Sequence, residues 1–174
     1  MAAPRVPLET RSGYAGPYLS VDIERWPGHV EYEVVHKHDA VGVVALTADR
    51  DVLLVRQFRP PVRDSLLEIP AGLLDVDGED ALTCATRELF EETGFRHTSI
   101  EFMGGCYLSP GFTDEYVHLF RAETSSEPET EPEAGIELIR MPFERAVAAA
   151  RDGKVRNAST ALALLMAAAR APGP

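Results

Sequence analysis

Alternating apolar and polar residues predict β-strands in the N-terminal part of the chain. The stretches YLSVDIERW (18–26) and VEYEVVHKH (30–38) both alternate, and the PGH between them supplies a turn, so we expect an antiparallel hairpin. Residues 40–58 contain two Val- and Leu-rich runs around a polar turn at 47–51, which predicts a second hairpin. The first dozen residues are rich in proline and are expected to be loose.

The pattern becomes helical over residues 79–93. Asp77 or Glu79 can cap the start of this helix, and acidic residues fall in its first turn. Gly94 stands where a helix-ending glycine belongs. The sequence therefore predicts one helix between the second hairpin and the strands that follow.

The remaining segments predict more strands and two closing helices. Strands are expected within 65–75, which Pro70 interrupts, and at 99–109, 115–123 and 137–141. An acidic, proline-spaced segment at 124–135 lacks apolar periodicity and is expected to be a mobile loop. Apolar periodicity predicts helices at 142–155, opened by Pro142, and at 158–171. Because strands outnumber helices and a helix interrupts the strand series, we predict an α+β domain with a mixed β-sheet.

On a helical wheel, residues 81–92 carry their acidic side chains next to an apolar stripe. The stripe expected to face the core consists of Ala81, Leu82, Ala85 and Leu89. Glu88 and Glu92 are four residues apart, so they stack along the edge of this stripe, and Glu91 lies one step further round. These carboxylates therefore line the border between core and water, where a cleft would open.

The three glutamates repel one another. Like charges four residues apart destabilise a helix by roughly 0.2–0.5 kcal/mol. Arg87 can offset one of them through Glu91, but it cannot reach all three. Hard oxygen ligands grouped in this way suit Mg²⁺ or Mn²⁺, which take carboxylates, water and substrate phosphates. From the wheel alone, a metal site and a solvated helix face both stay open.

Composition and charge narrow the class of protein. A chain of 174 residues with 45% hydrophobic content can bury the core of one domain. The net charge of −11 argues against nucleic acid or a membrane as a partner. Cys84 and Cys106 have no zinc-type cluster around them, which favours buried thiols in a reducing compartment. The N-terminus has no signal-peptide core, and the longest apolar stretch falls short of the ~20 residues that span a bilayer, so a cytoplasmic protein is expected.

The segment GLLDVDGEDALTCATRELFEETGF (72–95) resembles the Nudix box, G-x5-E-x7-R-E-U-x-E-E-x-G-U, where U is a bulky apolar residue. The matching positions are Glu79, Arg87, Glu88, Leu89, Glu91, Glu92, Gly94 and Phe95. Between Gly72 and Glu79 this chain has six residues instead of five. The extra residue lies in the loop before the helix, where an insertion costs little and the helix spacing is kept.

Neighbouring segments narrow this resemblance to one group. LLVRQFRPPV, LEIPAGLLD and LSPGFTDEYVHLF are similar to segments of ADP-ribose pyrophosphatases, and Pro110 lies sixteen residues beyond Gly94, as in that group. The resemblance covers residues 31–141. It implies a Nudix fold over 41–174, with the mixed β-sheet sandwiched between helices, and an N-terminal antiparallel hairpin or sheet over 1–40. It also implies hydrolysis of ADP-ribose to AMP and ribose 5-phosphate.

The resemblance implies a metal site on the helix. Glu88 and Glu92 match metal-binding glutamates, and Glu91 matches a third carboxylate that shares or orients the metal. The loop carbonyl of Ala71 matches a further metal ligand, and Arg87 would hold a carboxylate in position. Bound Mg²⁺ or Mn²⁺ would neutralise the diphosphate and activate a water. It would also cancel the repulsion between the glutamates.

Substrate contacts are implied at five positions. They are Arg59, Arg56, Glu33, Glu79 and Glu115. Arg59 matches a substrate-contacting arginine, whose planar guanidinium can grip diphosphate oxygens, and Glu115 matches a glutamate near the terminal ribose. A solvated strand end is the alternative for both arginines, and a turn carboxylate is the alternative for Glu115. Glu33 and Glu79 are candidates for substrate or metal-water contacts, and Glu68 could equally be structural.

The general base of the family is often a glutamate on the loop before the strand at 137–141. This loop offers Glu129, Glu131, Glu133 and Glu137. We predict Glu133.

Two further expectations concern assembly and function. The N-terminal strands are expected to cross to a partner subunit, giving a homodimer that shares the substrate site. Trp26, Tyr18 or Tyr32 could stack on adenine there, or could serve packing instead. The alternatives in function are a Nudix pyrophosphatase for another nucleotide sugar or dinucleotide, and a non-catalytic sensor of an ADP-ribose-type ligand.

Overall fold

The structure is a computed structural model and describes residues 5–170. Within this range the strands are β1 (Glu9–Ala15), β2 (Ser20–Trp26), β3 (Val30–His36), β4 (Ala40–Leu46), β5 (Asp51–Arg59), β6 (Asp64–Glu68), β7 (Ala71–Leu73), β8 (His97–Tyr107), β9 (Tyr116–Thr124) and β10 (Glu137–Pro142). The helices are α1 (Ala81–Thr93), α2 (Phe143–Arg151) and α3 (Ala158–Arg170). None of these helices is long and apolar enough to cross a bilayer.

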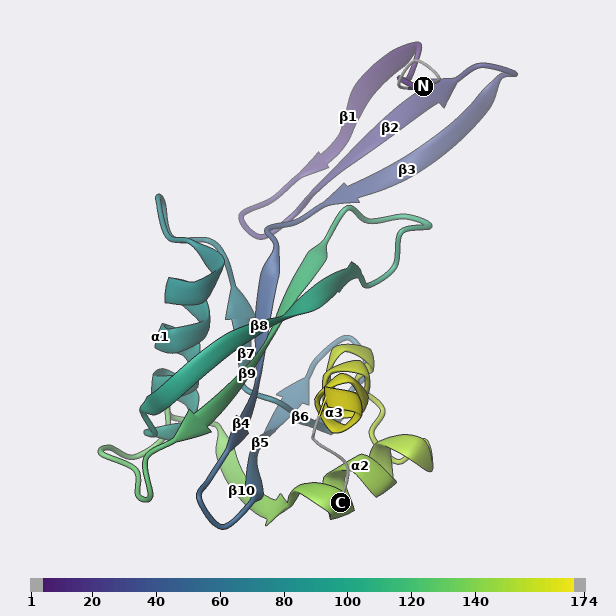
Figure 1. Ribbon diagram of the computed structural model, residues 1–174. Helices are drawn as coiled ribbons and strands as arrows, with labels where there is room; N and C mark the ends of the chain where they lie inside the picture. Colours follow the sequence, from purple (N-terminus) through teal and green to yellow (C-terminus); the bar gives the residue numbers. More distant parts are fainter. Residues whose placement is uncertain (1–4, 171–174) are drawn as a thin grey trace.

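The strands form two separate sheets. Strands β1, β2 and β3 make an antiparallel sheet, and the other seven make a sheet in the order β10-β5-β4-β9-β8, with β6 beside β5 and β7 beside β4. The second sheet is mixed because β4 and β9 run parallel while its other pairs are antiparallel. Figure 1 shows α1 on one side of this sheet and α2 and α3 on the other. The predicted α+β class and both predicted hairpins are confirmed.

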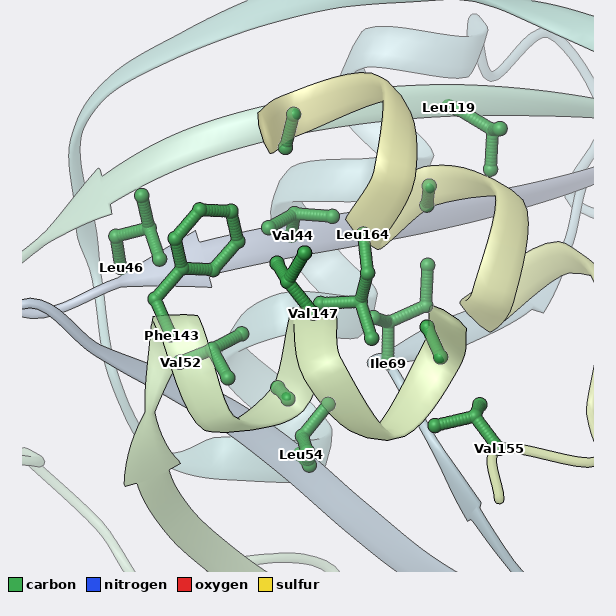
Figure 2. Packing of buried hydrophobic residues seen from close by; sticks show 14 of the residues in the cluster. Val44, Leu46, Val52, Leu54, Ile69, Leu119, Phe143, Val147, Val155 and Leu164 are labelled. Carbon is green, nitrogen blue, oxygen red and sulfur yellow. The ribbon is translucent and has the colours of Figure 1, made fainter. Parts of the chain in front are cut away.

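Strand β4 shows how the sheet holds its two helical layers. Successive side chains of a strand point to opposite faces. Val43 and Ala45 lie in a core cluster with Leu89 of α1, whereas Val44 and Leu46 lie in the cluster beneath α2 and α3. Figure 2 shows Phe143 and Val147 of α2 and Leu164 of α3 packed against this second face. Each large apolar side chain buried in this way contributes about 1.5–3 kcal/mol.

Helix α1 begins and ends at defined caps. Asp80 is the N-cap, because its carboxylate accepts a 2.8 Å hydrogen bond from the N–H of Thr83. The predicted caps Asp77 and Glu79 were wrong by one residue or more, and no acidic residue lies in the first turn. Gly94 ends the helix as predicted, with a left-handed φ of 76°.

The buried stripe of α1 is rotated relative to the predicted one. Leu82, expected in the core, is 47% exposed, and Glu92, expected at the edge, is buried. Seven residues at 100° each place Glu92 only about 20° from Ala85 around the helix axis, so the two share one face. The stripe therefore runs through Ala85 and Glu92, and Leu82 lies at its margin.

The N-terminal sheet has no core of its own. Strand β1 was not expected, because its polar sequence ETRSGYA carries no apolar alternation; it forms through backbone pairing with β2. None of residues 5–36 is buried. The sheet meets the rest of the molecule where the N–H of Val35 donates a 2.7 Å hydrogen bond to the carbonyl of Phe112.

The acidic segment predicted as a loop at 124–135 is irregular from residue 125 on, whereas Thr124 ends β9. Two backbone bonds tie this segment to α1. The N–H of Glu129 donates to the carbonyl of Gly94 at 2.7 Å, and the N–H of Glu133 donates to the carbonyl of Glu91 at 2.9 Å. These bonds satisfy carbonyl groups that the end of a helix leaves free. The segment therefore lies against the last turn of α1.

Candidate active site

A cleft of about 400 Å³ opens where β6 ends and β7 begins. Its walls come from four stretches of the chain that are distant in sequence, at 37–41, 59–73, 108–117 and 157–159. The polar and backbone groups lining it include Lys37 after β3, Arg59 of β5, Glu68 of β6, Ala71 and Gly72 of β7, Glu115 before β9, and Asn157 and Ser159 at the start of α3. The pairing of the strands and the docking of α3 bring these segments together, so the cleft is a product of the whole fold.

The carboxylates of α1 lie against the backbone of β7. Glu92 accepts a 2.9 Å hydrogen bond from the N–H of Ala71. Glu88 lies so close to Gly72 that a methyl group at this position would collide with its carboxyl. The absence of a side chain at Gly72 therefore makes room for Glu88 beside the cleft wall.

Both of these glutamates are held in surroundings that disfavour their charge. Burial, followed by the neighbouring charge of Glu88, raises the pKa of Glu92 to about 7. Burial also raises the pKa of Glu88, although Arg87 acts in the opposite direction. Negative charge at these two positions is therefore only partly compensated by the protein itself.

Arg87 joins the carboxylates on the outer side of α1. Its guanidinium donates two 2.9 Å hydrogen bonds to Glu79, one of 2.6 Å to Glu88 and one of 3.0 Å to Glu91. The pKa of Arg87 is raised chiefly by the bonds to Glu79. Arg87 thus reaches Glu88 as well as the Glu91 expected from the spacing, while Glu92 lies beyond it.

Arg59 pairs with a buried carboxylate inside the cleft. It donates hydrogen bonds of 3.0 and 2.5 Å to the two oxygens of Glu68, which is 3% exposed. Such a bidentate pair fixes the plane of the guanidinium. Glu68, whose role the sequence left open, therefore orients Arg59, which keeps part of its surface open to the cleft.

The structure brings some of the predicted residues together and leaves others apart. Glu115 lies in the cleft with Arg59, and its carboxylate accepts a 2.6 Å bond from Lys37. Arg56 instead pairs with Glu137 at 3.2 Å on the exposed surface of β5 and β10. Glu133 lies beside Glu91, at the outer edge of α1.

Glu33 lines a different and larger cavity of about 620 Å³. This cavity lies between the N-terminal sheet and the segment that joins β8 to β9, and its aromatic residues are Trp26, Tyr32, Tyr107 and Phe112. Trp26 and Tyr32 meet edge to face, with 6.4 Å between ring centroids. The cavity offers flat apolar surfaces of the kind that bind aromatic rings.

Three polar residues of the cleft were not predicted from the sequence. Lys37, Asn157 and Ser159 belong to no motif, and each reaches the cleft only because its element ends there. Asn157 caps α3 by accepting bonds from the hydroxyl of Ser159 and the N–H of Thr160. An asparagine followed by a serine and a threonine is a sequence signal for such a helix cap. This signal does not indicate that the cap lies at the cleft.

The donor set fits a hard divalent cation. Within residues 5–170, no three carboxylate, imidazole or thiol groups are already gathered around one point, and the arginines pair with several of the carboxylates instead. Glu88 and Glu92 nevertheless present carboxylate oxygens on successive turns. The pKa values of both are raised because their surroundings disfavour the negative charge, and a bound cation would stabilise that charge. Their chemistry suits Mg²⁺ or Mn²⁺ and not a thiolate-preferring metal.

Comparisons with known proteins identify the family of this chain. A family model described as the NUDIX domain matches residues 36–163. The chain is 34% identical over 136 residues to the methanol dehydrogenase activator of Bacillus methanolicus, covering 76% of this chain and 73% of that protein. It is 36% identical over 148 residues to the ADP-ribose pyrophosphatase of Bacillus subtilis, covering 82% and 80%. It is 36% identical over 124 residues to the GDP-mannose pyrophosphatase of Yersinia enterocolitica, covering 65% and 64%.

Proposed function

The chain belongs to the Nudix family of hydrolases, and from this premise we propose that it hydrolyses the diphosphate of ADP-ribose, with Mg²⁺ or Mn²⁺, to AMP and ribose 5-phosphate. One observation carries the proposal. The buried Glu92 and the largely buried Glu88 contact the backbone of Ala71 and Gly72, and this backbone lines the cleft together with Arg59. Acidic groups for a cation and a guanidinium for a diphosphate therefore flank one cavity.

The residues that would hold the metal are Glu88, Glu92, Glu91 and the carbonyl of Ala71. A bound divalent ion would neutralise the diphosphate, activate water and stabilise the departing phosphate. The chain's own groups prepare this site. Arg87 holds Glu88 and Glu91 in place, and the N–H of Ala71 fixes one oxygen of Glu92.

The cationic and polar residues that line the cleft would orient the substrate. Arg59, fixed by Glu68, would donate paired hydrogen bonds to the diphosphate oxygens. Glu115 would accept hydrogen bonds from the terminal ribose. The aromatic cavity of Trp26 and Tyr32 supports a place for the adenine ring, and Glu33 on its rim would contact the same half of the substrate.

Proton removal from the attacking water is assigned to Glu133. Its backbone is bonded to the carbonyl of Glu91, which keeps the acidic segment beside the metal-binding helix. Its exposed side chain would have to turn from the outer edge of α1 toward the cleft when substrate binds. Glu79 would act through Arg87, from which it accepts two hydrogen bonds. Arg56 would contact the substrate only after its ion pair with Glu137 breaks.

A homodimer is part of this proposal. The N-terminal sheet buries none of residues 5–36, yet it carries Tyr14, Val30 and Tyr32, which are 54, 44 and 51% exposed. A sheet of this kind needs a cover for its apolar side chains. A second copy would supply it and would close the aromatic cavity from outside. A protein that sediments as a monomer at assay concentrations while fully active would contradict this.

A nucleotide sugar is the second candidate substrate. It is favoured by the likeness to the GDP-mannose pyrophosphatase, which has the same percentage identity as the ADP-ribose pyrophosphatase but over a shorter alignment. The non-catalytic sensor has less support, because every carboxylate of the Nudix box is present in this chain.

A panel assay tests the proposal. The protein is incubated with ADP-ribose, GDP-mannose, ADP-glucose and a dinucleoside polyphosphate, each with Mg²⁺, Mn²⁺ or EDTA, and nucleotide release is measured. We expect AMP from ADP-ribose with the highest kcat/KM, and none with EDTA. No turnover of any diphosphate with either ion would refute the enzymatic proposal, and a higher kcat/KM for GDP-mannose would move it to the second candidate.

The base assignment has its own test. Glu133→Gln should lower kcat by about a hundredfold or more, because a general base contributes 10²- to 10⁴-fold. The matched substitutions Glu129→Gln and Glu131→Gln on the same segment should change kcat little. A small effect at Glu133 together with a large one at another of these glutamates would transfer the role.

A further inference from the structure

Two ion pairs join successive residues after β3 to successive residues before β9. His36 contacts Asp114 at 2.5 Å, and Lys37 contacts Glu115 at 2.6 Å. The backbone N–H of Lys37 also donates to the carboxylate of Asp114 at 3.2 Å. Residues 77 and 78 positions apart in the sequence are thus locked together at the mouth of the cleft.

The second of these pairs faces the cleft. Lys37 and Glu115 both line it, and their side chains are only 30% and 13% exposed. Within residues 5–170, the ion pair of Glu115 runs through Oε1, which leaves Oε2 able to accept further hydrogen bonds. A carboxylate this well buried has few other ways to compensate its charge.

Lys37 and Arg59 divide the acidic groups of the cleft between them. The charged side chains that line the cleft are Lys37, Arg59, Glu68 and Glu115, and each basic side chain pairs with one carboxylate. Lys37 therefore compensates the charge of Glu115 locally and fixes where its free acceptor oxygen points, whereas Glu68 orients Arg59.

We propose that Lys37 is a positioning residue that determines specificity for the sugar beyond the diphosphate. This inference rests on the proposed function. Lys37 holds Glu115 through Oε1, so that Oε2 accepts hydrogen bonds from the neighbouring hydroxyls of that sugar. Lys37 acts through Glu115 and not on the phosphates, which belong to Arg59 and the metal-binding side of the cleft.

Replacing Lys37 should therefore weaken substrate binding and leave the chemical step intact. In Lys37→Met, KM for ADP-ribose should rise about ten- to a hundredfold, the loss expected for a hydrogen bond to a charged group, while kcat stays within about threefold. Lys37→Arg keeps the charge and should recover most of this loss. Lys154→Met is the matched control, because Lys154 forms a similar 2.9 Å pair with Asp152 on the exposed surface.

A double-mutant cycle separates action through Glu115 from direct contact with substrate. Glu115→Gln alone should raise KM as Lys37→Met does, and the double variant should be no worse than the single Glu115→Gln. Additive losses would overturn the proposal. Because Glu115→Gln keeps the shape of the side chain, it tests the proposal even if Lys37→Met does not fold.

Inhibition by ADP supplies a readout that a merely structural role would not give. ADP lacks the distal sugar, so its inhibition constant should change less than about twofold in Lys37→Met. A rise as large as that of the KM for ADP-ribose would show a general loss of the site or a phosphate contact, and would overturn the proposal. Failure of wild-type protein to hydrolyse ADP-ribose counts against the proposed function, whereas wild-type turnover with an unchanged KM in Lys37→Met counts against this inference alone.

Discussion

The hydroxyl of Thr160, in α3, accepts a 3.0 Å hydrogen bond from the backbone N–H of Ile69, 91 residues earlier in the chain. Both residues are almost fully buried, at 1% exposure each. Ile69 lies at the bend between Glu68, which orients Arg59, and Ala71, which holds Glu92. One hydroxyl of the C-terminal helix therefore fixes the bend on which both sides of the cleft depend.

Thr160→Val should cost both stability and activity. The valine has the same shape but leaves the N–H of Ile69 buried without an acceptor, which costs about 1–3 kcal/mol. Chemical denaturation should show this loss, and kcat/KM should fall because Glu68 and Ala71 shift. Thr98→Val, which removes an exposed hydroxyl bond from β8, is the control and should stay within about 0.5 kcal/mol of wild type. Equal stability of the two variants would show that the bond does not hold the bend.

Glu92→Gln should abolish turnover and preserve the fold. The amide oxygen of glutamine can still accept the bond from Ala71, but the side chain no longer provides a negative charge for a cation. We expect kcat/KM to fall by at least about a hundredfold, with an unchanged circular dichroism spectrum. Glu144→Gln, at a residue whose side chain is 72% exposed, should be as active as wild type. An active Glu92→Gln enzyme would remove this residue from the proposed metal site.

The stability of the N-terminal attachment should depend on pH through His36. The hydrogen bond that His36 donates to Asp114, together with the nearby charges of Asp114, Asp22 and Glu24, raises the pKa of His36 above 6.5. Burial pushes the pKa of Asp114 up, but bonds from His36 and the N–H of Lys37 bring it below 3.8. The pair therefore stabilises fully below the ordinary pKa of histidine and above that of aspartate, and its contribution is lost as pH rises through the folded-state pKa of His36.

His36→Asn measures this contribution. The free energy of unfolding should drop by up to about 1 kcal/mol near pH ~5.5, because the histidine is partly exposed and solvent screens the pair. The difference from wild type should shrink as the pH rises through the folded-state pKa of His36. His97→Asn at the start of β8 is the control. A difference that grows with pH would mean that the pair acts with the opposite sign.

Cys84 should be inert in the folded protein. Burial raises the pKa of its thiol to about 12, so only about one molecule in ten thousand is a thiolate at pH ~8. Cys106 is only partly buried, and burial raises its pKa as well. A thiol reagent followed by mass spectrometry should modify Cys106 first and Cys84 only after denaturant is added. Equal labelling of both thiols at pH ~8 without denaturant would contradict the buried position of Cys84.

Local patterns were enough to predict much of the fold. Gly94, the two hairpins and the two closing helices follow from turn chemistry and apolar periodicity, which act over a few residues. Strand β1 could not be predicted in this way, because pairing with β2 holds it and its own side chains bury nothing. The prediction that Leu82 lies in the core was wrong for a related reason. A wheel gives the relative angles of side chains, but only the neighbouring sheet decides which angle faces the core.

The candidate site also has a part that could be predicted from the sequence and a part that could not. The carboxylates of α1 were predictable, because they belong to one helix with fixed spacing. The rest of the cleft was not, because Glu68, Lys37 and Asn157 reach it from strands and loops that meet only in the folded chain. The prediction that Arg87 would relieve only Glu91 shows the same limit. Its contact with Glu79 depends on how the segment before α1 bends back.

The wall that Asn157 and Ser159 give to the cleft has a consequence for biosynthesis. A ribosome that has delivered every residue through Arg156 has already produced the whole Nudix box, both cationic side chains of the cleft and the glutamates behind them. The nascent chain still lacks the hydroxyl that fixes the bend at Ile69 and the segment that closes the cavity. The cleft is therefore complete only after the start of α3 has folded back onto strands that were synthesised long before.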